Sequence, residues 1–557
     1  MNYPSIPLAQ LTVGLCQYTG LKHIVLSPGS RNAPLTIGFT ENPYFKTYSV
    51  VDERSAAFFA LGIAQQTKEP VAVVCTSGSA LLNYYPAIAE AFYSRIPLVV
   101  LSADRPTNFI DIGDGQTIRQ PNVYANHILY NANCIEADEE MLNNKKLIFE
   151  ALQIAQQEMG PVHINLPFSE PLYEKVKAPT IRIRQSDLPQ ITKEEWNPKE
   201  LERYLDQWNT AQKKMVLVGV LAPGSLEQQL VDKLLQDPSV LVLTETTSNL
   251  SGSKLIPTID MLLEGLSEIR CKMLQPDLLL TFGGFVVSKK IKAFLRAYTP
   301  ILHWHVDPYT ELDTYFVLSK YFQTNIQNFL STLLVSEPRV RSNYQDIFWH
   351  AYQERINRRK IFVETAPYSD FGVYYHIFNQ LPKECNLHLS NSATIRYAQL
   401  FSIPKSVSVY CNRGTSGIDG STSTAIGAAV ASNKQTLLVT GDLSFFYDSN
   451  ALWNANTPND FRIIVVNNSG GGIFRIIPGP KQATEFTAYF ETKHHLTAQH
   501  LAAMYNYEYM PVTDYASLEV ALFNFYDASD RPKIIEVFTP REKNEGVLSD
   551  YFKFIHE

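Results

Sequence analysis

The sequence lacks the features that mark secreted, membrane or nucleic-acid-binding proteins. Its six cysteines are scattered without a CxxC pair, which favours reduced thiols over a disulfide framework. The longest apolar runs fall well short of the ~20 residues that span a bilayer, and residues 1–20 have no basic start followed by an apolar run. The formal net charge is −7 without a Lys/Arg block, so nothing indicates a nucleic-acid surface. We therefore expect a cytoplasmic protein with neither membrane insertion nor a nucleic-acid partner.

What is present is the composition of a large globular protein. The 557 residues are 45% hydrophobic and 18% charged, and at ~150 residues per domain they suggest three or four units. Short β-branched runs alternate with amphipathic segments, which predicts parallel sheets built from βαβ units. The expected strands form three series: 23–26, 71–75, 98–101 and 162–166; then 215–220, 240–244, 278–282 and 302–306; then 407–411, 436–440, 463–466 and 534–538.

The first and third series look alike beyond their class. The string VAVVCTSGSALLNYYPAIAEA with the following IPLVVLSADRP parallels TLLVTGDLSFFYDSNALWNA with the following FRIIVVNNSGGG. Thr76 and Thr440 lie 364 positions apart, and the strands after them keep nearly that offset. Polar segments near 177–199 and 336–345 are the expected linkers. We therefore expect an α/β protein of three doubly wound parallel-sheet domains, two of them related, at residues 1–178, 195–338 and 355–557.

The strongest chemical signal lies in the third series, where polar residues follow two strands. Gly441-Asp442-Leu443-Ser444 comes directly after one strand, and Asn467-Asn468 with Gly470–Gly472 follows the next. Asp442 and Asn468 are 26 positions apart, a spacing at which a βαβ unit returns to the same edge of the sheet. Mg²⁺ prefers such oxygen ligands and completes its shell with phosphate oxygens and water. Since three glycines also let the backbone approach a ligand, a metal-bound diphosphate is predicted.

Taken singly, either fragment is typical of an ordinary turn, and only the combination favours a binding site. Together they resemble the GDG…N signature of thiamine-diphosphate enzymes. The resemblance assigns Asp442, Asn468 and the Gly470 carbonyl to Mg²⁺ (or Mn²⁺). Leu443 departs from the signature without removing a metal ligand. The cofactor-binding residues implied here are Gly441, Asp442, Leu443, Ser444, Asn468, Gly470, Gly471 and Gly472.

An acidic pair precedes a helix-like segment in the first series. Val50-Val51-Asp52-Glu53-Arg54 puts acidic residues at the end of an expected apolar strand, just before the helix-like residues 55–66. Acidic residues are favourable at any helix N-terminus, so the pair alone has an ordinary structural interpretation. In thiamine-diphosphate enzymes, however, a glutamate carboxyl activates the cofactor by hydrogen bonding to its N1′ atom, and Glu53 matches that residue. We expect burial to raise the pKa of Glu53 and Asp52 to be structural.

Six further strings are spread over nearly the whole chain: SPGSRNAPL at 27–35, DER at 52–54, SADRP at 102–106, SNS at 390–392, NRGTSGIDG at 412–420 and GGGIF at 470–474. They closely resemble the SEPHCHC (2-succinyl-5-enolpyruvyl-6-hydroxy-3-cyclohexene-1-carboxylate) synthase or MenD family of menaquinone biosynthesis. The resemblance implies a transferase that decarboxylates 2-oxoglutarate on thiamine diphosphate and adds the succinyl carbanion equivalent to isochorismate, releasing CO₂. It also implies a homodimer or homotetramer with active sites at the subunit interface.

Both implied substrates are dicarboxylates, which guanidinium groups bind through paired hydrogen bonds. By position in the family motifs, Glu53 and Gln116 are catalytic. Ile418 resembles the residue that holds the cofactor in its bent shape. Ile473 and Phe474 resemble the residues that form the apolar wall beside the reacting carbon. For each of the three, ordinary core packing is an equal alternative. For Lys289 and Lys290, an ordinary solvent-exposed position without a role in binding is an equal alternative. The implied substrate-binding residues are Ser30, Arg31, Arg105, Gln116, Lys289, Lys290, Asn391, Ser392, Arg396 and Arg413.

Other classes remain open from the sequence. An acetohydroxyacid-synthase-like carboligase or decarboxylase would share the cofactor motifs, although the middle series shows no flavin-binding counterpart. A nicotinamide-dependent dehydrogenase is disfavoured because no strand-linked GxGxxG occurs. A binding protein without catalytic activity is also disfavoured, because Glu53 occurs together with the Asp442/Asn468 pair. We assign no catalytic histidine, since four histidines lie in apolar strand patterns that favour hydrogen-bonded core positions: His23, His163, His303 and His305.

Overall fold

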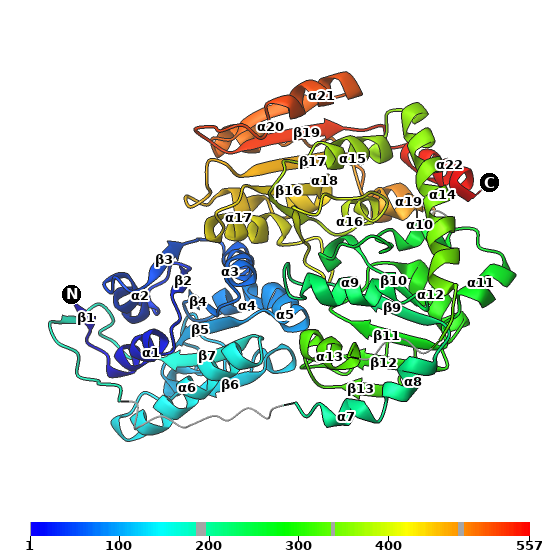
Figure 1. Ribbon diagram of the computed structural model, residues 1–557. Coiled ribbons are helices and arrows are strands. Elements are labelled where there is room, and N and C mark those ends of the chain that lie inside the picture. Colours follow the sequence, from blue (N-terminus) through cyan, green and yellow to red (C-terminus); the bar gives the residue numbers. More distant parts are fainter. Residues whose placement is uncertain (1, 185–195, 336–339, 477–483, 557) are drawn as a thin grey trace.

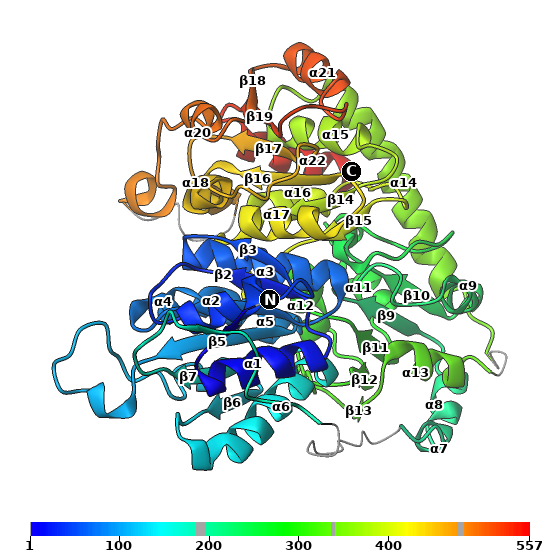
Figure 2. The ribbon, with the colours of Figure 1, turned by 90° about the vertical axis from the view of Figure 1, so that its left-hand side faces the viewer.

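The computed structural model describes residues 2–184, 196–335, 340–476 and 484–556. It contains three parallel sheets, one for each predicted series of strands (Figure 1). The third unit, yellow to red, lies above the first, blue to cyan, and the green middle unit lies beside the first (Figures 1 and 2). This arrangement confirms the predicted class of three α/β domains. No helix in the described ranges combines the length and apolar character needed to span a bilayer.

The first sheet consists of β2 (His23–Leu26), β3 (Lys46–Ser49), β4 (Val71–Cys75), β5 (Leu98–Asp104), β6 (Tyr130–Asn133) and β7 (Val162–Pro167) in the order β3-β2-β4-β5-β7-β6. Its helices are α1 (Pro7–Tyr18), α2 (Ala33–Thr40), α3 (Glu53–Thr67), α4 (Ser79–Asn83), α5 (Tyr85–Ser94) and α6 (Met141–Gln157). Successive strand residues point to opposite faces. Ile24 and Leu26 pack with α1 and α6, whereas Val25 packs with α3 and α5. Both faces are therefore covered, as in a doubly wound sheet.

The third sheet repeats the first. Its strands are β14 (Asn386–Leu389), β15 (Ser408–Tyr410), β16 (Thr436–Gly441), β17 (Arg462–Asn467), β18 (Glu508–Val512) and β19 (Lys533–Phe538), in the order β15-β14-β16-β17-β19-β18. Numbered within each sheet, both orders read 2-1-3-4-6-5, so the internal repeat is confirmed as shared topology. The helices of this unit are α14 (Tyr344–Thr365), α15 (Asp370–Asn379), α16 (Ala393–Ala398), α17 (Ser421–Ala431), α18 (Asp442–Tyr447), α19 (Ile473–Ile476), α20 (Gln499–Met504), α21 (Tyr515–Phe523) and α22 (Asn544–His556).

The middle sheet has five parallel strands, β9 (Lys214–Val218), β10 (Val240–Leu243), β11 (Leu278–Phe282), β12 (Leu302–Val306) and β13 (Lys320–Phe322), in the order β10-β9-β11-β12-β13. Its helices are α7 (Lys199–Glu202), α8 (Leu205–Thr210), α9 (Gln228–Gln236), α10 (Ile259–Leu263), α11 (Glu268–Leu274), α12 (Lys289–Ala297) and α13 (Ile326–Leu333). A separate antiparallel pair joins β1 (Tyr3–Pro4) to β8 (Lys175–Val176).

The strand prediction misses the edge strands β3, β6, β13 and β18 and the inner strand β14. Edge strands are paired on one side only, so they need no continuous apolar run, and none of the four side chains of β3 is fully buried. β14 is buried, but Asn386 and His388 interrupt its apolar pattern. The apolar strand expected before Glu53 is wrong, because β3 ends at Ser49 and residues 50–52 lead into α3.

Each sheet lies within one of the three predicted domain ranges, whose boundaries stay a prediction. The expected linkers fall partly outside the described residues, at 185–195 and 336–339. The second linker ends earlier than expected, because α14 begins at Tyr344. Tyr344 donates to Leu274 O of the middle unit at 2.6 Å, and Arg359 of the same helix donates to Leu400 O of the third unit at 2.6 Å. α14 therefore connects these two units.

Two glycines bring the first and third units together. α3 and α17 cross with their backbones in contact, since a Cβ atom at Gly62 would lie 2.0 Å from Thr424 O and one at Gly427 would lie 2.0 Å from Phe59 O. Real Cβ atoms essentially never come closer than 3.0 Å to such atoms, so only glycine permits this spacing. The crossing bears on the site because α3 begins at Glu53.

Candidate cofactor and substrate site

Asp442 lies at the carboxyl end of β16, where its side chain meets the chain that follows β17. Its Oδ2 accepts a hydrogen bond from Gly470 N at 2.9 Å, and His494 Nε2 lies 3.2 Å from the same oxygen. β16 and β17 are neighbouring parallel strands, so the residues after them share one edge of the sheet. The structure thus brings Asp442 to the backbone of Gly470, two residues after Asn468, the residue whose spacing from Asp442 predicts a shared sheet edge.

Asn468 presents the two ends of its amide to different surroundings. Its Nδ2 donates to Asp370 Oδ2 at 2.9 Å. Its Oδ1 is buried and has no hydrogen-bond partner among the described residues. A buried acceptor without a partner is costly, and a bound cation would supply the missing partner. The residues therefore fit the sparse oxygen set that Mg²⁺ takes from proteins.

No group of three or more His, Cys, Asp and Glu side chains in the described ranges could hold a metal. A metal at this edge therefore depends on neutral oxygens besides the Asp442 carboxylate. The donor set is typical of Mg²⁺ or Mn²⁺ and not of a thiolate or imidazole metal.

The turn Gly470–Gly472 requires glycine. Gly470 has a φ of 149°, and a Cβ atom there would lie 2.6 Å from Glu491 O. A Cβ atom at Gly472 would lie 2.8 Å from Asn468 Nδ2. The turn is also anchored, because Gly471 N donates to Glu491 O at 2.6 Å. Side chains at this turn would displace the Asn468 amide or the backbone beside it.

The segment around Glu491 closes over this turn. Glu491 is fully buried and accepts from Arg475 Nη2 at 2.9 Å, and Arg541 Nη1 lies 3.4 Å from the same carboxylate oxygen. Ile473 is buried and Phe474 half-buried on α19, with the Phe474 ring 6.1 Å from that of Phe490. The two predicted wall residues thus follow directly from the glycine turn.

The loop before α17 reaches the start of α18. Ser444 Oγ donates to Ile418 O at 2.7 Å, which holds the half-buried Ile418 beside the Asp442 turn. Gly441 N donates to Ser390 Oγ at 3.3 Å, and Leu443 N donates to Asp442 Oδ1 at 2.7 Å. The predicted cofactor residues of the third unit therefore gather around one sheet edge.

Glu53 stands at the boundary of the first and third units. Asp52 caps α3 by accepting from Ser55 N at 3.1 Å, which confirms its expected structural role. Burial raises the pKa of Glu53, the Asp52 charge raises it too, and hydrogen bonds oppose the shift. The expected direction of this pKa is therefore confirmed. Arg54 donates to Tyr447 O at 2.7 Å across the boundary.

Two predicted arginines lie together in the third unit. Arg413 Nη1 donates to Asn391 Oδ1 at 2.6 Å, while Asn391 Nδ2 donates to Asn412 O and Gly417 O at 2.6 and 2.7 Å. Asn391 is thus buried and fully bonded, so it orients the Arg413 loop. Burial lowers the pKa of Arg396 and the Arg413 charge lowers it further, which places the two cations within electrostatic reach. The Nε atoms of both arginines are buried without a partner in the described residues.

The predicted residues of the first unit form a second group. Arg31 is 6% exposed, donates to Phe168 O at 2.8 Å and pairs with Glu170 at 3.2 Å. Burial lowers its pKa, and the charge of Arg105 lowers it too, so these arginines are neighbours. Arg105 lies 3.9 Å from Asp114, and its Nε is unpartnered among the described residues. Arg105 is therefore freer than Arg31 to bind an anion.

Two polar residues of the first unit are more accessible. Ser30 is exposed, and its hydroxyl lies 2.8 Å from Tyr173 Oη. Gln116 is exposed at a positive φ of 58°, with its amide donating to Ser77 O at 3.3 Å. In the third unit, Ser392 is half-buried at a φ of 71°, and its side chain does not cap α16.

The structure separates the two predicted lysines. Lys290 pairs with Glu264 and lies 3.9 Å from the centre of the Phe552 ring, whereas Lys289 is exposed at the start of α12. Lys292, nearly one turn further, is half-buried. Burial lowers its pKa, the Glu245 charge opposes that shift, and Arg413 and Arg396 add to the lowering. Lys292 therefore lies within electrostatic reach of the two arginines.

Sequence reasoning missed Asp370, His494 and Lys292. Asp370 looks like an ordinary helix start in YSDFG, and Lys292 like one more exposed lysine. The pair His494-His495 is a visible signal, but no motif connects it to Asp442. The four histidines expected in the core are buried and hydrogen-bonded, for example His163 to Ser102 at 2.7 Å and His303 and His305 to Thr281 at 2.9 Å each.

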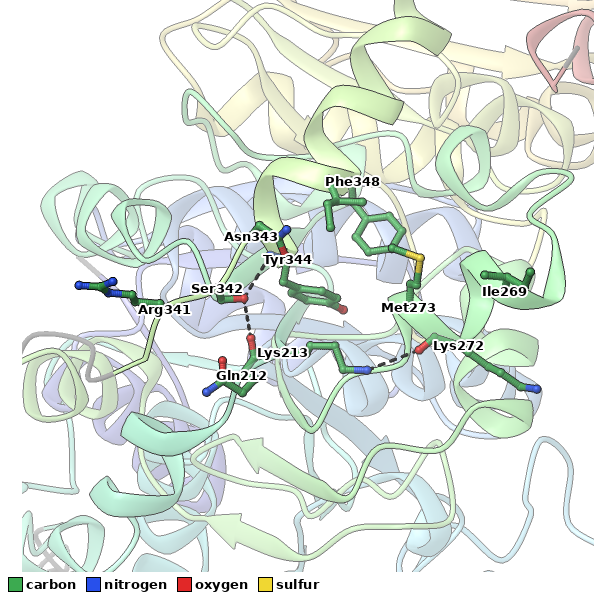
Figure 3. A pocket seen from close by; sticks show the side chains of 11 residues that line it. Gln212, Lys213, Ile269, Lys272, Met273, Arg341, Ser342, Asn343, Tyr344 and Phe348 are labelled. Carbon is green, nitrogen blue, oxygen red and sulfur yellow. Dashed lines mark hydrogen bonds between the residues drawn. The ribbon is translucent and has the colours of Figure 1, made fainter.

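A cavity of about 550 Å³ lies away from this edge, between the middle unit and the start of α14 (Figure 3). Ser342 donates to Gln212 O at 2.8 Å and Lys213 donates to Lys272 O at 3.4 Å on its wall. None of the predicted site residues lines this cavity, so it is separate from the candidate site. Its lining is Gln212, Lys213, Ile269, Lys272, Met273, Arg341, Ser342, Asn343, Tyr344, Ile347 and Phe348.

Models of thiamine pyrophosphate enzymes match the chain in three parts: the N-terminal TPP binding domain at 7–125, the middle domain at 183–389 and the C-terminal TPP binding domain at 392–537. Curated relatives named 2-succinyl-5-enolpyruvyl-6-hydroxy-3-cyclohexene-1-carboxylate synthase are similar over the whole length. One from Flavobacterium psychrophilum is 52% identical, covering 99% of this chain and 100% of the relative. One from Christiangramia forsetii is 50% identical and covers 100% of both chains, and one from Bacteroides thetaiotaomicron is 37% identical and covers 97% of both.

Proposed function

Because the chain belongs to the 2-succinyl-5-enolpyruvyl-6-hydroxy-3-cyclohexene-1-carboxylate synthase family of thiamine-diphosphate-dependent carboligases, we propose that it decarboxylates 2-oxoglutarate and joins the remaining succinyl unit to isochorismate. CO₂ is released, and the reaction is a cytoplasmic step of menaquinone biosynthesis. The observation that carries the proposal is the meeting of Asp442, Gly470 and the Asn468 amide oxygen, which has no partner in the described part of the chain, at one sheet edge. An acetohydroxyacid-synthase-like activity is not favoured, because relatives similar over the whole chain share the synthase name.

The third unit would hold the cofactor through a metal. Asp442, the Asn468 amide oxygen and the Gly470 carbonyl would bind Mg²⁺ or Mn²⁺, and the backbone of Gly441, Leu443, Ser444, Gly471 and Gly472 would face the diphosphate. Thiamine diphosphate, when bound, supplies the carbon nucleophile for decarboxylation and transfer. Ile418 would hold its bent shape, and Ile473 and Phe474 would exclude water. Glu53 would hold a proton at N1′, a role that suits the raised pKa of its carboxyl.

The cationic residues would bind the substrate carboxylates. Arg396 and Arg413 have unpartnered, buried Nε atoms in the described part of the chain, so a carboxylate would satisfy donors that the protein leaves open. Arg105 would serve in the same way in the first unit, with Arg31 behind it. Ser30, Gln116, Lys289, Lys290, Asn391 and Ser392 complete the proposed set, in which Lys290 is restrained by Glu264 and Asn391 acts by orienting Arg413.

We place the active site between two chains of a homodimer or homotetramer. Within one chain, burial raises the pKa of the Glu53 carboxyl, and the side chains that shift it further, Asp52 and Asn83, belong to its own unit. Exposed apolar side chains lie beside it: Val51, two residues before Glu53, is 42% exposed, and Tyr447, whose carbonyl accepts from Arg54, is 53% exposed. Such a patch is typical of a surface that another protein covers. A second copy would bring its Asp442 edge to this Glu53.

The activity is tested with the purified protein, thiamine diphosphate, Mg²⁺, 2-oxoglutarate and isochorismate, with the product identified by mass. The synthase product is expected only when both substrates are present. Acetohydroxy acid formation from pyruvate, without any product from 2-oxoglutarate and isochorismate, would refute the assignment in favour of the alternative.

The shared site is tested with mixed dimers. Glu53→Gln and Asp442→Ala chains are each expected to be nearly inactive. In a purified mixed dimer, one site would carry both changes and the other neither, so about half of the wild-type activity per dimer should return. If each site lay within one chain, every site would carry one change and no activity would return.

A further inference from the structure

Asp370 is a buried carboxylate beside the proposed metal site. It is the first residue of α15 and is 2% exposed. Its Oδ2 accepts from Asn468 Nδ2 at 2.9 Å, and its Oδ1 accepts from Thr539 Oγ1 at 2.5 Å. Its backbone N–H donates to Asn544 Oδ1 at 2.9 Å. Both carboxylate oxygens are therefore in use, and the group is held by residues after β17 and β19.

The contact determines which end of the Asn468 amide faces the ligand. A carboxylate only accepts hydrogen bonds, whereas an amide has a donating and an accepting end. Asn468 must therefore turn its Nδ2 toward Asp370, and its Oδ1 points the other way. In the described residues that oxygen is buried without a partner. If the amide were reversed, two acceptors would meet at Asp370 and an NH₂ group would face the cation.

We infer that Asp370 is a positioning residue for the metal: it sets the rotation of the Asn468 amide so that an oxygen, and not an NH₂ group, is presented to the cation. The inference deepens the proposed function and rests on it. Groups of this kind, which orient a ligand without touching the metal, typically change metal affinity roughly 10–100-fold when they are removed.

Asp370 also has a simpler role, because an acidic residue in the first turn stabilises a helix. That role would change the stability of the fold and leave Mg²⁺ affinity alone. Measuring both Mg²⁺ affinity and the melting temperature therefore separates the two roles. The affinity measurement does not depend on catalytic turnover.

The experiment measures the Mg²⁺ concentration that half-saturates thiamine diphosphate binding, by calorimetry on the full-length protein. Asp370→Ala and Asp370→Leu both remove the carboxylate that accepts from Asn468, and leucine also fills the volume of the lost side chain. If one variant does not fold, the other still tests the inference. Asp370→Asn is the conservative variant, since its oxygen can accept from Asn468 while the Thr539 hydroxyl accepts from its NH₂ group. Asp237→Ala removes a buried carboxylate of the middle unit, paired with Lys214 at 2.9 Å, and serves as the control for lost stability.

We expect the half-saturating Mg²⁺ concentration to rise roughly 10–100-fold in Asp370→Ala and Asp370→Leu, and to stay near the wild-type value in Asp370→Asn and Asp237→Ala. Asn468→Ala should also lose affinity. If Asp370→Ala and Asp370→Leu both kept the wild-type half-saturating Mg²⁺ concentration while Asn468→Ala lost Mg²⁺ affinity, only the positioning role would be overturned. A wild-type value in Asn468→Ala would overturn the metal assignment and this inference with it.

Discussion

Replacing Gly427 with alanine tests whether the α3–α17 crossing aligns the site. The new Cβ atom would lie 2.0 Å from Phe59 O, where contacts below 3.0 Å are essentially never seen, so the two helices must separate by at least about 1 Å. The neighbour is backbone of a buried helix and cannot rotate away as a side chain could. Overpacking of this kind typically costs about 1–3 kcal/mol.

The displacement should lower catalysis as well as stability. α3 begins at Glu53, and α17 follows directly after the Ile418 loop, so separating the helices moves the proposed activating carboxyl and the proposed cofactor support. A misplacement of about 1 Å can lower a rate ~100-fold. We therefore expect a kcat/KM reduced by about two orders of magnitude in Gly427→Ala, with a lower Tm but a folded protein.

The assay combines steady-state kinetics with scanning calorimetry. Gly546→Ala is the matched control, because a Cβ atom at Gly546 meets no atom of the described residues within 4 Å and alanine is the better helix former by up to about 1 kcal/mol. The control should keep wild-type kinetics and an equal or higher Tm. Wild-type kcat/KM and Tm in Gly427→Ala would show that the crossing neither depends on glycine nor aligns the site.

Three further predictions concern the proposed site. Asp442→Ala should lose thiamine diphosphate affinity, because one of the few protein ligands to the metal is removed; unchanged binding by calorimetry would contradict the metal assignment. Glu53→Gln should keep the fold and cofactor binding but slow proton exchange at C2 of bound cofactor, followed by NMR, since an amide cannot relay that proton. Because its pKa is raised, the Glu53 carboxyl stays protonated to higher pH than an ordinary glutamate. Glutamine does not titrate, so Glu53→Gln should also remove any pH dependence of C2 proton exchange that this carboxyl causes. Arg396→Ala and Arg413→Ala should weaken one or both substrates by about 2–5 kcal/mol with cofactor binding intact; unaltered steady-state constants would remove them from the site.

Much of the architecture follows from the sequence alone. Strands buried on both faces are mostly apolar, so β4, β5, β7, β16, β17 and β19 are visible as β-branched runs. The repeated offset between the two halves predicts two related sheets, and both sheets have the same strand order. That Asp442 and the segment from Asn468 to Gly470 reach the same edge also follows, because neighbouring parallel strands place the residues after them at one edge.

Short edge strands do not follow from the sequence in the same way. β3 and β13 pair along one side and remain partly exposed, so their residues carry little apolar signal. For the lysines of α12, spacing along the helix cannot tell which one meets Glu264 and which one lies near Arg396 and Arg413. Glu264 follows α10, and both arginines belong to the third unit, so the way these elements lie against α12 makes the distinction.

Only the tertiary structure decided how Asn468 is turned and how close α3 comes to α17. The type and spacing of residues determine which groups reach the sheet edge, since these are properties of a strand and the turn after it. The rotation of the Asn468 amide depends on Asp370 and Thr539, 98 and 71 positions away in the chain. The approach of the two helices likewise depends on Gly62 facing the backbone of α17 at Thr424 and on Gly427 facing the backbone of α3 at Phe59. Such contacts form only once separate units have packed together, because hydrogen-bond direction and backbone spacing between distant segments have no local pattern along the chain.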